Sequence, residues 1–325
     1  MRRSVAAGEV IVTGTGRDAY DLALLVCCEA RGSAIVVLDN PRDDVEAPEI
    51  LPERRLLVFP EDRGMEPAER DLWIGRIADR AWDIFIRTGG NMAELAEALR
   101  QRGCPVDPTP VSDTSSPPPT TSGSPRPLPP PPGTAGPWEF LSHYTREPDG
   151  AWLGEPRAVY LGWLAHGHHD DHRDAGGALR RILSERTIRA SGRLMPGRCP
   201  MVSFTALPPG EVGRLMKWRT GLHRWTVRPY GVAVRRAVLE AIGARPVSYL
   251  ASADIQRLPE AERLFSQKHE PPATDWAGEI EWRLRGDLRL DSIPATDLRL
   301  IAPSPLDAER LRAEFGIEAI AIWRQ

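Results

Sequence analysis

The segment 107–137, DPTPVSDTSSPPPTTSGSPRPLPPPPGTAGP, constrains the fold of this chain more than any other part of its sequence. Its only large apolar residues are Val111 and Leu128. A segment with so little apolar surface cannot offset the entropy lost on ordering, and its proline runs favour extended polyproline II. We therefore expect a disordered Pro/Ser/Thr linker between an N-terminal domain, 1–106, and a C-terminal domain, 138–325.

The composition is that of a globular protein and excludes several classes of function. The 325 residues are 41% hydrophobic and 27% charged, and the net charge of −3 gives no overall attraction to nucleic acid or anionic membranes. No stretch approaches the ~20 apolar residues of a membrane span, and no signal-peptide core is present. The four cysteines form no CxxC pair, which argues against a zinc or disulfide framework. We expect a cytoplasmic protein that does not contact membranes.

The N-terminal domain alternates strand-like and helix-like segments. Apolar runs rich in β-branched residues occur in EVIVTGTG, SAIVVLDN, RRLLVFPE and WDIFIRTGG, and CPV begins a further short strand. Helical spacing of apolar residues occurs in RDAYDLALLVCCEARG, PAERDLWIGRIADRA and NMAELAEALRQRG. This alternation predicts an α/β domain with a Rossmann-like parallel sheet.

Two glycine turns lie at the carboxyl ends of predicted strands, and each opens a predicted helix. One contains Gly14 and Gly16, and the other contains Gly89 and Gly90. A helix N-terminus offers unpaired N–H groups, and ligands of open α/β sheets bind at this edge. We predict a nucleotide pocket there, although neither turn is a GxGxxG or a Walker A motif.

The segment PAERDLWIGRIADRAWDIFIRTGGNMAELAEALRQRGCPV resembles the SLOG superfamily, which includes DNA-processing protein A and the LOG enzymes. The resemblance covers about 1–106. The LOG turn reads GGxGTxxE and acts on a nucleotide together with an upstream arginine. Here Gly89, Gly90 and Glu94 match at contracted spacing without the GT, and Arg70 or Arg76 fits the arginine. The resemblance implies that a nucleotide or nucleotide-derived small molecule is bound rather than cleaved. The alternative for Arg70 and Glu94 is solvated helix charge.

The C-terminal domain mixes strands and helices without regular alternation, which predicts an α+β fold. Its motifs resemble the AbiGi/DUF2971-like group, which is linked to abortive phage resistance. The matching stretches are 143–145 (HYT), 179–191, 201–205 (MVSFT), 230–234 (YGVAV), 246–249 (PVSY) and 279–283 (EIEWR). The resemblance implies an antiphage protein in which the nucleotide-sensing domain controls this domain as its effector.

The same layout is distantly similar to ADP-ribosyltransferases of the DarT type. In these enzymes a histidine at the end of the first strand holds the NAD ribose, and a glutamate on a late strand promotes transfer. The resemblance implies that His143 and either Glu281 or Glu279 are catalytic, with NAD as cosubstrate and no metal. Two-residue spacing places Glu279, Glu281 and Arg283 on one face of a strand, where Arg283 could bind pyrophosphate. The structural alternative is a surface ion-pair ladder.

A basic and aromatic stretch, MKWRTGLHRWTVRPYG, supports a rival hypothesis. Lys217, Arg219, Arg224 and Trp225 could grip single-stranded nucleic acid through phosphate contacts and stacking. They could equally form the edge of a core, with arginine stems lying over tryptophans. The rival function is therefore that of a DNA-processing-like protein that binds single-stranded nucleic acid and catalyses no reaction. If the domain is instead a transferase, we expect a nucleic acid or a protein as its acceptor.

The run LAHGHHDDHRDAGG, 164–177, nearly matches the HxHxDH motif of metallo-β-lactamases, but His172 comes one residue late. That fold requires further histidine and aspartate ligands at strand ends, but the later histidines are His223, in a basic and aromatic stretch, and His269, beside a Pro-Pro turn. We therefore expect a polar loop with no metal site, in which Asp174 or Gly176 flanks the start of a helix. A metal-dependent hydrolase or nuclease is the third alternative.

Overall fold

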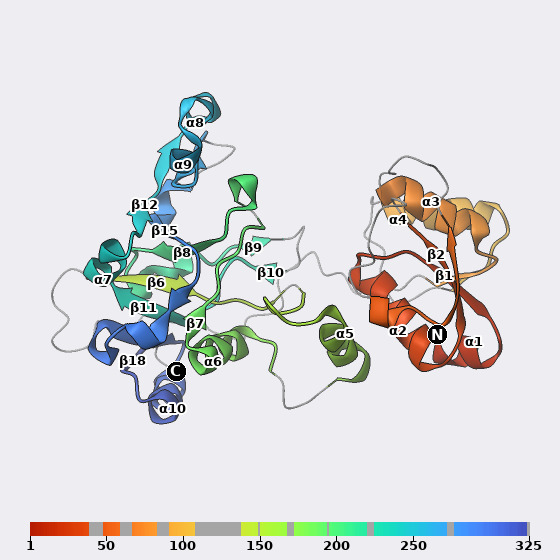
Figure 1. Cartoon of the computed structure of the whole chain (residues 1–325), viewed down its shortest axis with the longest axis horizontal. Coiled ribbons are helices and arrows are strands. Elements are labelled where there is room, and N and C mark those ends of the chain that lie inside the picture. Colours follow the sequence, from red (N-terminus) through yellow and green to blue (C-terminus); the bar gives the residue numbers. More distant parts are fainter. Residues whose placement is uncertain are drawn as a thin grey trace. The chain divides into compact units, whose positions relative to one another are not determined.

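The computed structural model of the chain has a mixed α/β architecture with two compact units (Figure 1). The described residues are 1–38, 48–58, 67–82, 91–107, 138–148, 150–167, 172–193, 195–219, 224–271 and 276–323. The first unit is drawn from 1–113 and 149–169, and the second from 114–148 and 170–325. The expected linker lies outside the described residues except for Asp107, which ends a strand.

The first unit contains the predicted parallel sheet. Strands β1 (Val10–Thr13), β2 (Ser33–Val37) and β3 (Arg54–Val58) pair in that order, and both pairings are parallel. Helix α2 (Asp18–Glu29) connects β1 to β2 and packs against both strands. A parallel sheet with helical crossovers is what the alternating pattern predicts. The other elements of this unit are α1 (Arg2–Ala6), η1 (Pro48–Ile50), α3 (Pro67–Ile77), α4 (Asn91–Gln101) and the parallel pair β4 (Ala81–Trp82) and β5 (Val106–Asp107).

Helix α5 (Arg157–His166) follows the proline-rich segment in sequence but packs in the first unit, against α2 (Figure 1). Its Tyr160 and Leu161 are buried in the same apolar core as Leu24 of α2. This position differs from the sequence-based expectation, in which 157–166 belongs to the C-terminal domain and forms no helix. The first unit is therefore discontinuous in sequence.

The second unit is built on a seven-stranded sheet of order β12-β15-β8-β6-β11-β17-β18. Its strands are β6 (Phe140–Tyr144), β8 (Met201–Thr205), β11 (Gly231–Arg235), β12 (Arg245–Pro246), β15 (Glu281–Arg285), β17 (Leu298–Ala302) and β18 (Ala319–Ala321). All neighbours are antiparallel except β17 and β18. Mixed pairing with interspersed helices confirms the predicted combination of strands and helices.

Both faces of this sheet are covered, as alternation along β6 shows. Leu141 joins a core with Leu179 of α6 (Ala175–Glu185) and Leu311 of α10 (Pro305–Phe315). Its neighbour Phe140 joins a different core with Val212 of the 3₁₀ segment η3 (Pro209–Arg214). Successive strand residues point to opposite faces, so α6 and α10 cover one face and η3 the other.

The remaining elements of the second unit are short helices, 3₁₀ segments and strands of two-stranded sheets that lie between the strands of the large sheet in sequence. They are β7 (Thr187–Ile188), η2 (Pro196–Arg198), β9 (Trp218–Arg219), β10 (Arg224–Trp225), α7 (Arg236–Ala241), β13 (Ser248–Leu250), α8 (Ser252–Arg257), α9 (Glu260–Arg263), β14 (Ser266–Lys268), η5 (Ala277–Glu279), β16 (Leu288–Arg289), η6 (Leu290–Ser292) and η7 (Ala295–Asp297). Asp174 caps α6 by accepting a hydrogen bond from the Gly177 N–H at 2.7 Å, as predicted for this helix start. Within the described residues, no helix has the length and apolar character needed to cross a membrane.

Candidate functional site

Glu281 and Arg283 form an ion pair on β15. Both side chains point to the same face, as the two-residue spacing predicts, and the guanidinium is bidentate to the carboxylate at 2.9 and 3.0 Å. Arg283 is buried and also donates to the carbonyls of Leu264 and Ser266 and to Gln267 Oε1. These five bonds use all five N–H donors of the guanidinium. Arg283 therefore acts in this structure as the counter-ion of Glu281, and its donors are not available for a pyrophosphate.

Ser203 of β8 joins the two residues that the sequence analysis predicted to be catalytic. Its hydroxyl donates to Glu281 Oε1 at 2.8 Å, and its carbonyl lies 2.9 Å from His143 Nδ1. A carbonyl can only accept, so His143 Nδ1 carries the proton and Nε2 is an acceptor in the neutral ring. Burial lowers the pKa of His143, and the charge of Arg146 acts in the same direction, so the neutral form predominates near pH 7. The sequence analysis did not single out Ser203, because its role depends on strand pairing.

His143 and Glu281 nevertheless start from opposite faces of the sheet. Ser142 of β6 is opposite Thr205 of β8, and Thr205 is opposite Glu281 of β15, so these three share a face. His143 is one residue further along β6, and its ring packs edge-on against Phe204, with centroids 6.0 Å apart. The polar connection between His143 and Glu281 therefore runs through the backbone and side chain of Ser203.

Glu279 does not share the strand with Glu281, and the expectation of one continuous E-x-E-x-R face is wrong. Glu279 ends the 3₁₀ turn η5, and Ile280 then adopts a left-handed conformation, with φ 44° and ψ 55°. Strand β15 begins only at Glu281. The break at Ile280 directs the two glutamates into different surroundings.

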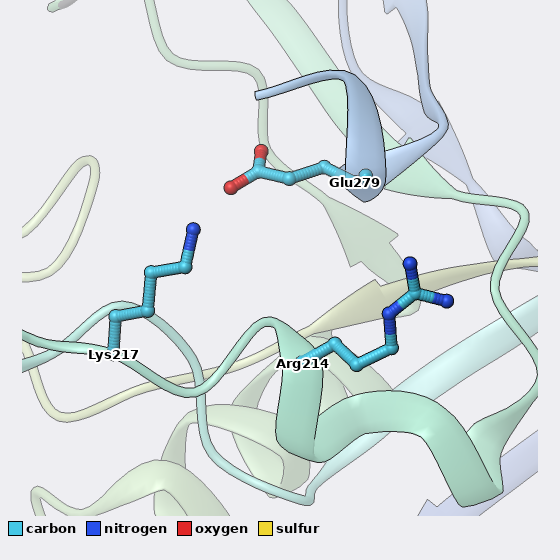
Figure 2. A pocket seen from close by; sticks show the side chains of 4 residues that line it. Arg214, Lys217 and Glu279 are labelled. Atoms are coloured by element: carbon cyan, nitrogen blue, oxygen red, sulfur yellow. The ribbon is translucent and has the colours of Figure 1, made fainter. Parts of the chain in front are cut away.

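Glu279 lines a pocket of about 190 Å³ together with Arg214, Lys217 and Gly278. Figure 2 shows the Glu279 carboxylate directed toward the Lys217 ammonium, with the Arg214 guanidinium apart from both, on the side of the η5 turn. Arg214 Nη1 pairs with Glu211 Oε2 at 2.5 Å. Burial raises the pKa of Glu279 above its ordinary value, and the neighbouring charge of Glu281 adds to this effect. The cations Lys217 and Arg219 oppose the shift. A carboxylate with a perturbed pKa in a cationic pocket is a candidate for acid–base chemistry.

The basic and aromatic stretch flanks this pocket. Lys217 and Arg219 lie over the ring of Trp276, 5.2 and 5.3 Å from its centroid. Trp225 packs edge-on against Trp218, with centroids 5.6 Å apart, and is partly buried, as is Arg224. This arrangement matches the predicted alternative in which basic side chains cover partly buried tryptophans.

The first glycine turn of the N-terminal unit has the predicted arginine against it. Arg70 of α3 is buried, and its Nη1 donates to the Thr15 carbonyl at 2.9 Å. A Cβ added to Gly14 would lie 3.0 Å from Arg70 Cδ, so a larger residue here would require the Arg70 side chain to shift. Gly16 has φ 78°, a left-handed conformation that favours glycine. The structure thus brings together Gly14, Gly16 and Arg70.

The amide at this turn already has an anionic partner within the chain. The Gly16 N–H donates to Asp21 Oδ1 at 2.9 Å, and Arg157 of α5 holds Asp21 Oδ2 at 3.0 and 2.8 Å. Arg157 also pairs with Asp18 at 2.6 Å. An anionic ligand at the turn would have to compete with Asp21 for this amide.

The other predicted residues of the first unit are not joined to this turn by any described contact. Glu94 lies exposed on α4, as expected for solvated helix charge. Arg76 stacks on Trp73, with its guanidinium 5.0 Å from the ring centroid. Gly89 and Gly90 lie outside the described residues.

The histidine run also falls partly outside the described residues, which exclude 168–171. His166 ends α5 and contacts Glu29 of α2 at 2.8 Å. Among the residues that the structure describes, no group of three or more histidine, cysteine, aspartate or glutamate side chains is arranged to hold a metal ion.

Comparisons of this chain with family models, with curated proteins and with solved structures gave no match.

Proposed function

We propose that the second unit is a group-transfer enzyme that acts on a phosphorylated substrate, and that its reaction is ADP-ribosyl transfer from NAD. The observation that carries this proposal is the pocket, lined also by Arg214, in which Glu279, with its raised pKa, faces Lys217 beside the ion-paired Glu281. Cationic side chains can bind a pyrophosphate. A carboxylate with a raised pKa can accept the proton of the acceptor group and lies where it can stabilise an oxocarbenium charge. The distant similarity to DarT-type ADP-ribosyltransferases supports the same reaction.

The roles of the side chains follow from where they lie. In the proposed reaction the bond from ribose C1′ to the nicotinamide nitrogen breaks, nicotinamide leaves with the electron pair, and an acceptor atom bonds to C1′. Glu279 takes the proton that the acceptor loses and stabilises the oxocarbenium charge. Lys217 binds the pyrophosphate, and Arg214, whose Nη1 pairs with Glu211, lines the same pocket. Glu281, held by Arg283 and Ser203, keeps a fixed negative charge next to Glu279.

We assign His143 a positioning role in this scheme. Its Nδ1–H bond to the Ser203 carbonyl ties β6 to β8 beside the bond from Ser203 to Glu281. The His143 side chain leaves the sheet on the face opposite to Glu281, whereas Glu279 lines the pocket. Glu279 is therefore the stronger candidate for contact with the reacting atoms. His143→Gln should therefore reduce turnover less than Glu279→Gln.

The experiment is to incubate the full chain with NAD and a bacterial extract and to measure released nicotinamide by chromatography. Glu279→Gln should lower the release by about 10²-fold or more, the usual contribution of a general base. Lys217→Gln should mainly raise the KM for NAD. Glu262→Gln is a matched control, because this exposed carboxylate pairs with Arg245 away from the pocket. If the wild-type chain releases no nicotinamide with either nucleic-acid or protein acceptors supplied, the transferase proposal is wrong.

For the first unit we propose that a nucleotide-derived small molecule binds at the Gly14–Gly16 turn and controls the effector, as in a cytoplasmic antiphage protein. The buried Arg70 at the turn supports this proposal, and Asp21 must yield the Gly16 amide to the ligand. A panel of nucleotides should raise the unfolding temperature of this unit. Arg70→Met should abolish the increase, whereas Arg76→Met should not.

A second candidate function is binding of single-stranded nucleic acid without turnover. The observation that favours it is the pair of cations, Lys217 and Arg219, on the Trp276 ring. A gel shift of single-stranded DNA that weakens steeply with salt, and that Arg219→Gln reduces, would support it. If Arg219→Gln binds single-stranded DNA as tightly as the wild type does, Arg219 does not contact the nucleic acid.

A further inference from the structure

Ile280 has a backbone conformation that is unusual for its residue type. Its φ of 44° lies in the left-handed region, where a β-branched side chain is strained and where glycine or asparagine is usual. The side chain is 46% exposed, so burial in the core does not compensate for this strain. Strained residues of this kind persist where the surrounding structure fixes them, and they cluster at functional sites.

Hydrogen bonds from β8 fix the backbone on both sides of Ile280. Thr205 Oγ1 donates to the Glu279 carbonyl at 2.5 Å, and the Ala206 N–H donates to the Ile280 carbonyl at 3.0 Å. The Glu281 N–H donates to the hydroxyl of Tyr249 at 2.9 Å. Thr205 is buried, so its bond to Glu279 is protected from water.

The kink decides where Glu279 can reach. If 279–281 were extended, Glu279 and Glu281 would share a face of the sheet, and Glu279 would lie opposite Leu207, beyond the pairing of Glu281 with Thr205. The left-handed residue between them instead sends Glu279 into the pocket with Lys217 (Figure 2). Glu281 keeps its ion pair on the sheet.

We propose that Ile280 and Thr205 are positioning residues that hold Glu279 in the pocket, with Thr205 maintaining the strained kink. This inference rests on the proposed function, in which Glu279 is the reacting carboxylate. Because the conformation of Ile280 is strained, it depends on the hydrogen bond from Thr205 to the Glu279 carbonyl. Without this bond, the backbone relaxes to an extended conformation, and Glu279 leaves the pocket. Asparagine at position 280 adopts the left-handed conformation readily and removes this dependence.

The test is a pair of variants and their combination, Thr205→Val, Ile280→Asn and the double variant, all in the full chain. The primary measurement is the titration of the Glu279 carboxyl carbon by ¹³C NMR, assigned with Glu279→Gln. Thr205→Val should lower the pKa of Glu279 toward the ordinary glutamate value, because the side chain moves out to solvent. Ile280→Asn alone should leave the titration unchanged, and the double variant should restore it.

Turnover is the second measurement. Thr205→Val should lower kcat/KM about tenfold to hundredfold, the scale expected for a misplaced catalytic group, and the double variant should recover most of this loss. An unchanged Glu279 titration in Thr205→Val, or an equal loss in the double variant, would overturn the inference. If the wild-type chain shows no turnover while the titrations behave as expected, the proposed function fails and the positioning of Glu279 stands.

Discussion

The ion pair of Glu281 and Arg283 makes a prediction about stability that separates structural from chemical effects. Arg283 is 4% exposed, and Glu281 is its only anionic partner among five hydrogen bonds. Glu281→Gln therefore leaves a buried cation with only neutral acceptors. Breaking a buried pair costs about 3–5 kcal/mol, and the three remaining acceptors place this case near the lower limit, at about 3 kcal/mol.

This loss converts into a measurable change in melting temperature. The second unit falls in the size range for which 1 kcal/mol shifts Tm by about 2–4 °C, so Glu281→Gln should lower its transition by about 6–12 °C. Differential scanning calorimetry of the full chain measures the shift. The double variant Glu281→Gln/Arg283→Met should recover part of it, because it removes the uncompensated cation but leaves the Leu264 and Ser266 carbonyls without their donor.

Glu262→Gln is the control, since Glu262 and its partner Arg245 are both exposed. Its Tm should not change measurably. The reasoning is refuted if Glu281→Gln melts with the wild type, or if the double variant is less stable than the single one. In either case the buried pair would not have the energetic role that its geometry indicates.

Three further predictions concern other parts of the chain. Leu161→Ala should destabilise the first unit, although position 161 follows the proline-rich segment, by about 2–5 kcal/mol in calorimetry; a loss confined to the second unit's transition would contradict the packing of α5. Gly14→Ala should cost about 1–3 kcal/mol, because the new methyl crowds Arg70, and should remove any nucleotide-induced rise in Tm. Burial lowers the pKa of His143, so the unfolded chain binds a proton near pH 6 that the folded chain does not. The free energy of unfolding of the second unit should therefore fall as the pH drops below about 6.5, and urea titrations at pH 7.5 and 5.5 should show a smaller fall in His143→Gln.

Local patterns in the sequence predicted much of the secondary structure. The strands at 10–13, 33–37 and 54–58 fall within apolar runs identified from β-branched composition. Helix 175–185 begins at its aspartate cap as expected. These features depend on neighbours along the chain, and the residues that produce them are visible in short windows.

Helix α5 was missed because its packing partners are distant in sequence. Its buried residues, Tyr160 and Leu161, complete a core formed by 1–50, and its end residues Arg157 and His166 contact Asp21 and Glu29. A reader of the sequence sees only a short apolar run next to a polar, histidine-rich stretch. Tertiary contacts decide to which unit this helix belongs, and the local spacing of apolar residues does not reveal them.

The candidate site shows the same limit at the scale of single residues. A two-residue spacing predicted that Glu279, Glu281 and Arg283 share a strand face, and this holds for Glu281 and Arg283 alone. Nothing about isoleucine predicts a left-handed turn, since Thr205 and Ala206 on another strand impose it. The departure from the regular pattern is therefore informative. It separates two glutamates that a regular strand would place side by side, so that one stabilises the sheet as a buried ion pair and the other faces the cations of the pocket. The regular two-residue pattern fails at Glu279 because the left-handed Ile280 turns this carboxylate away from the strand and into the pocket.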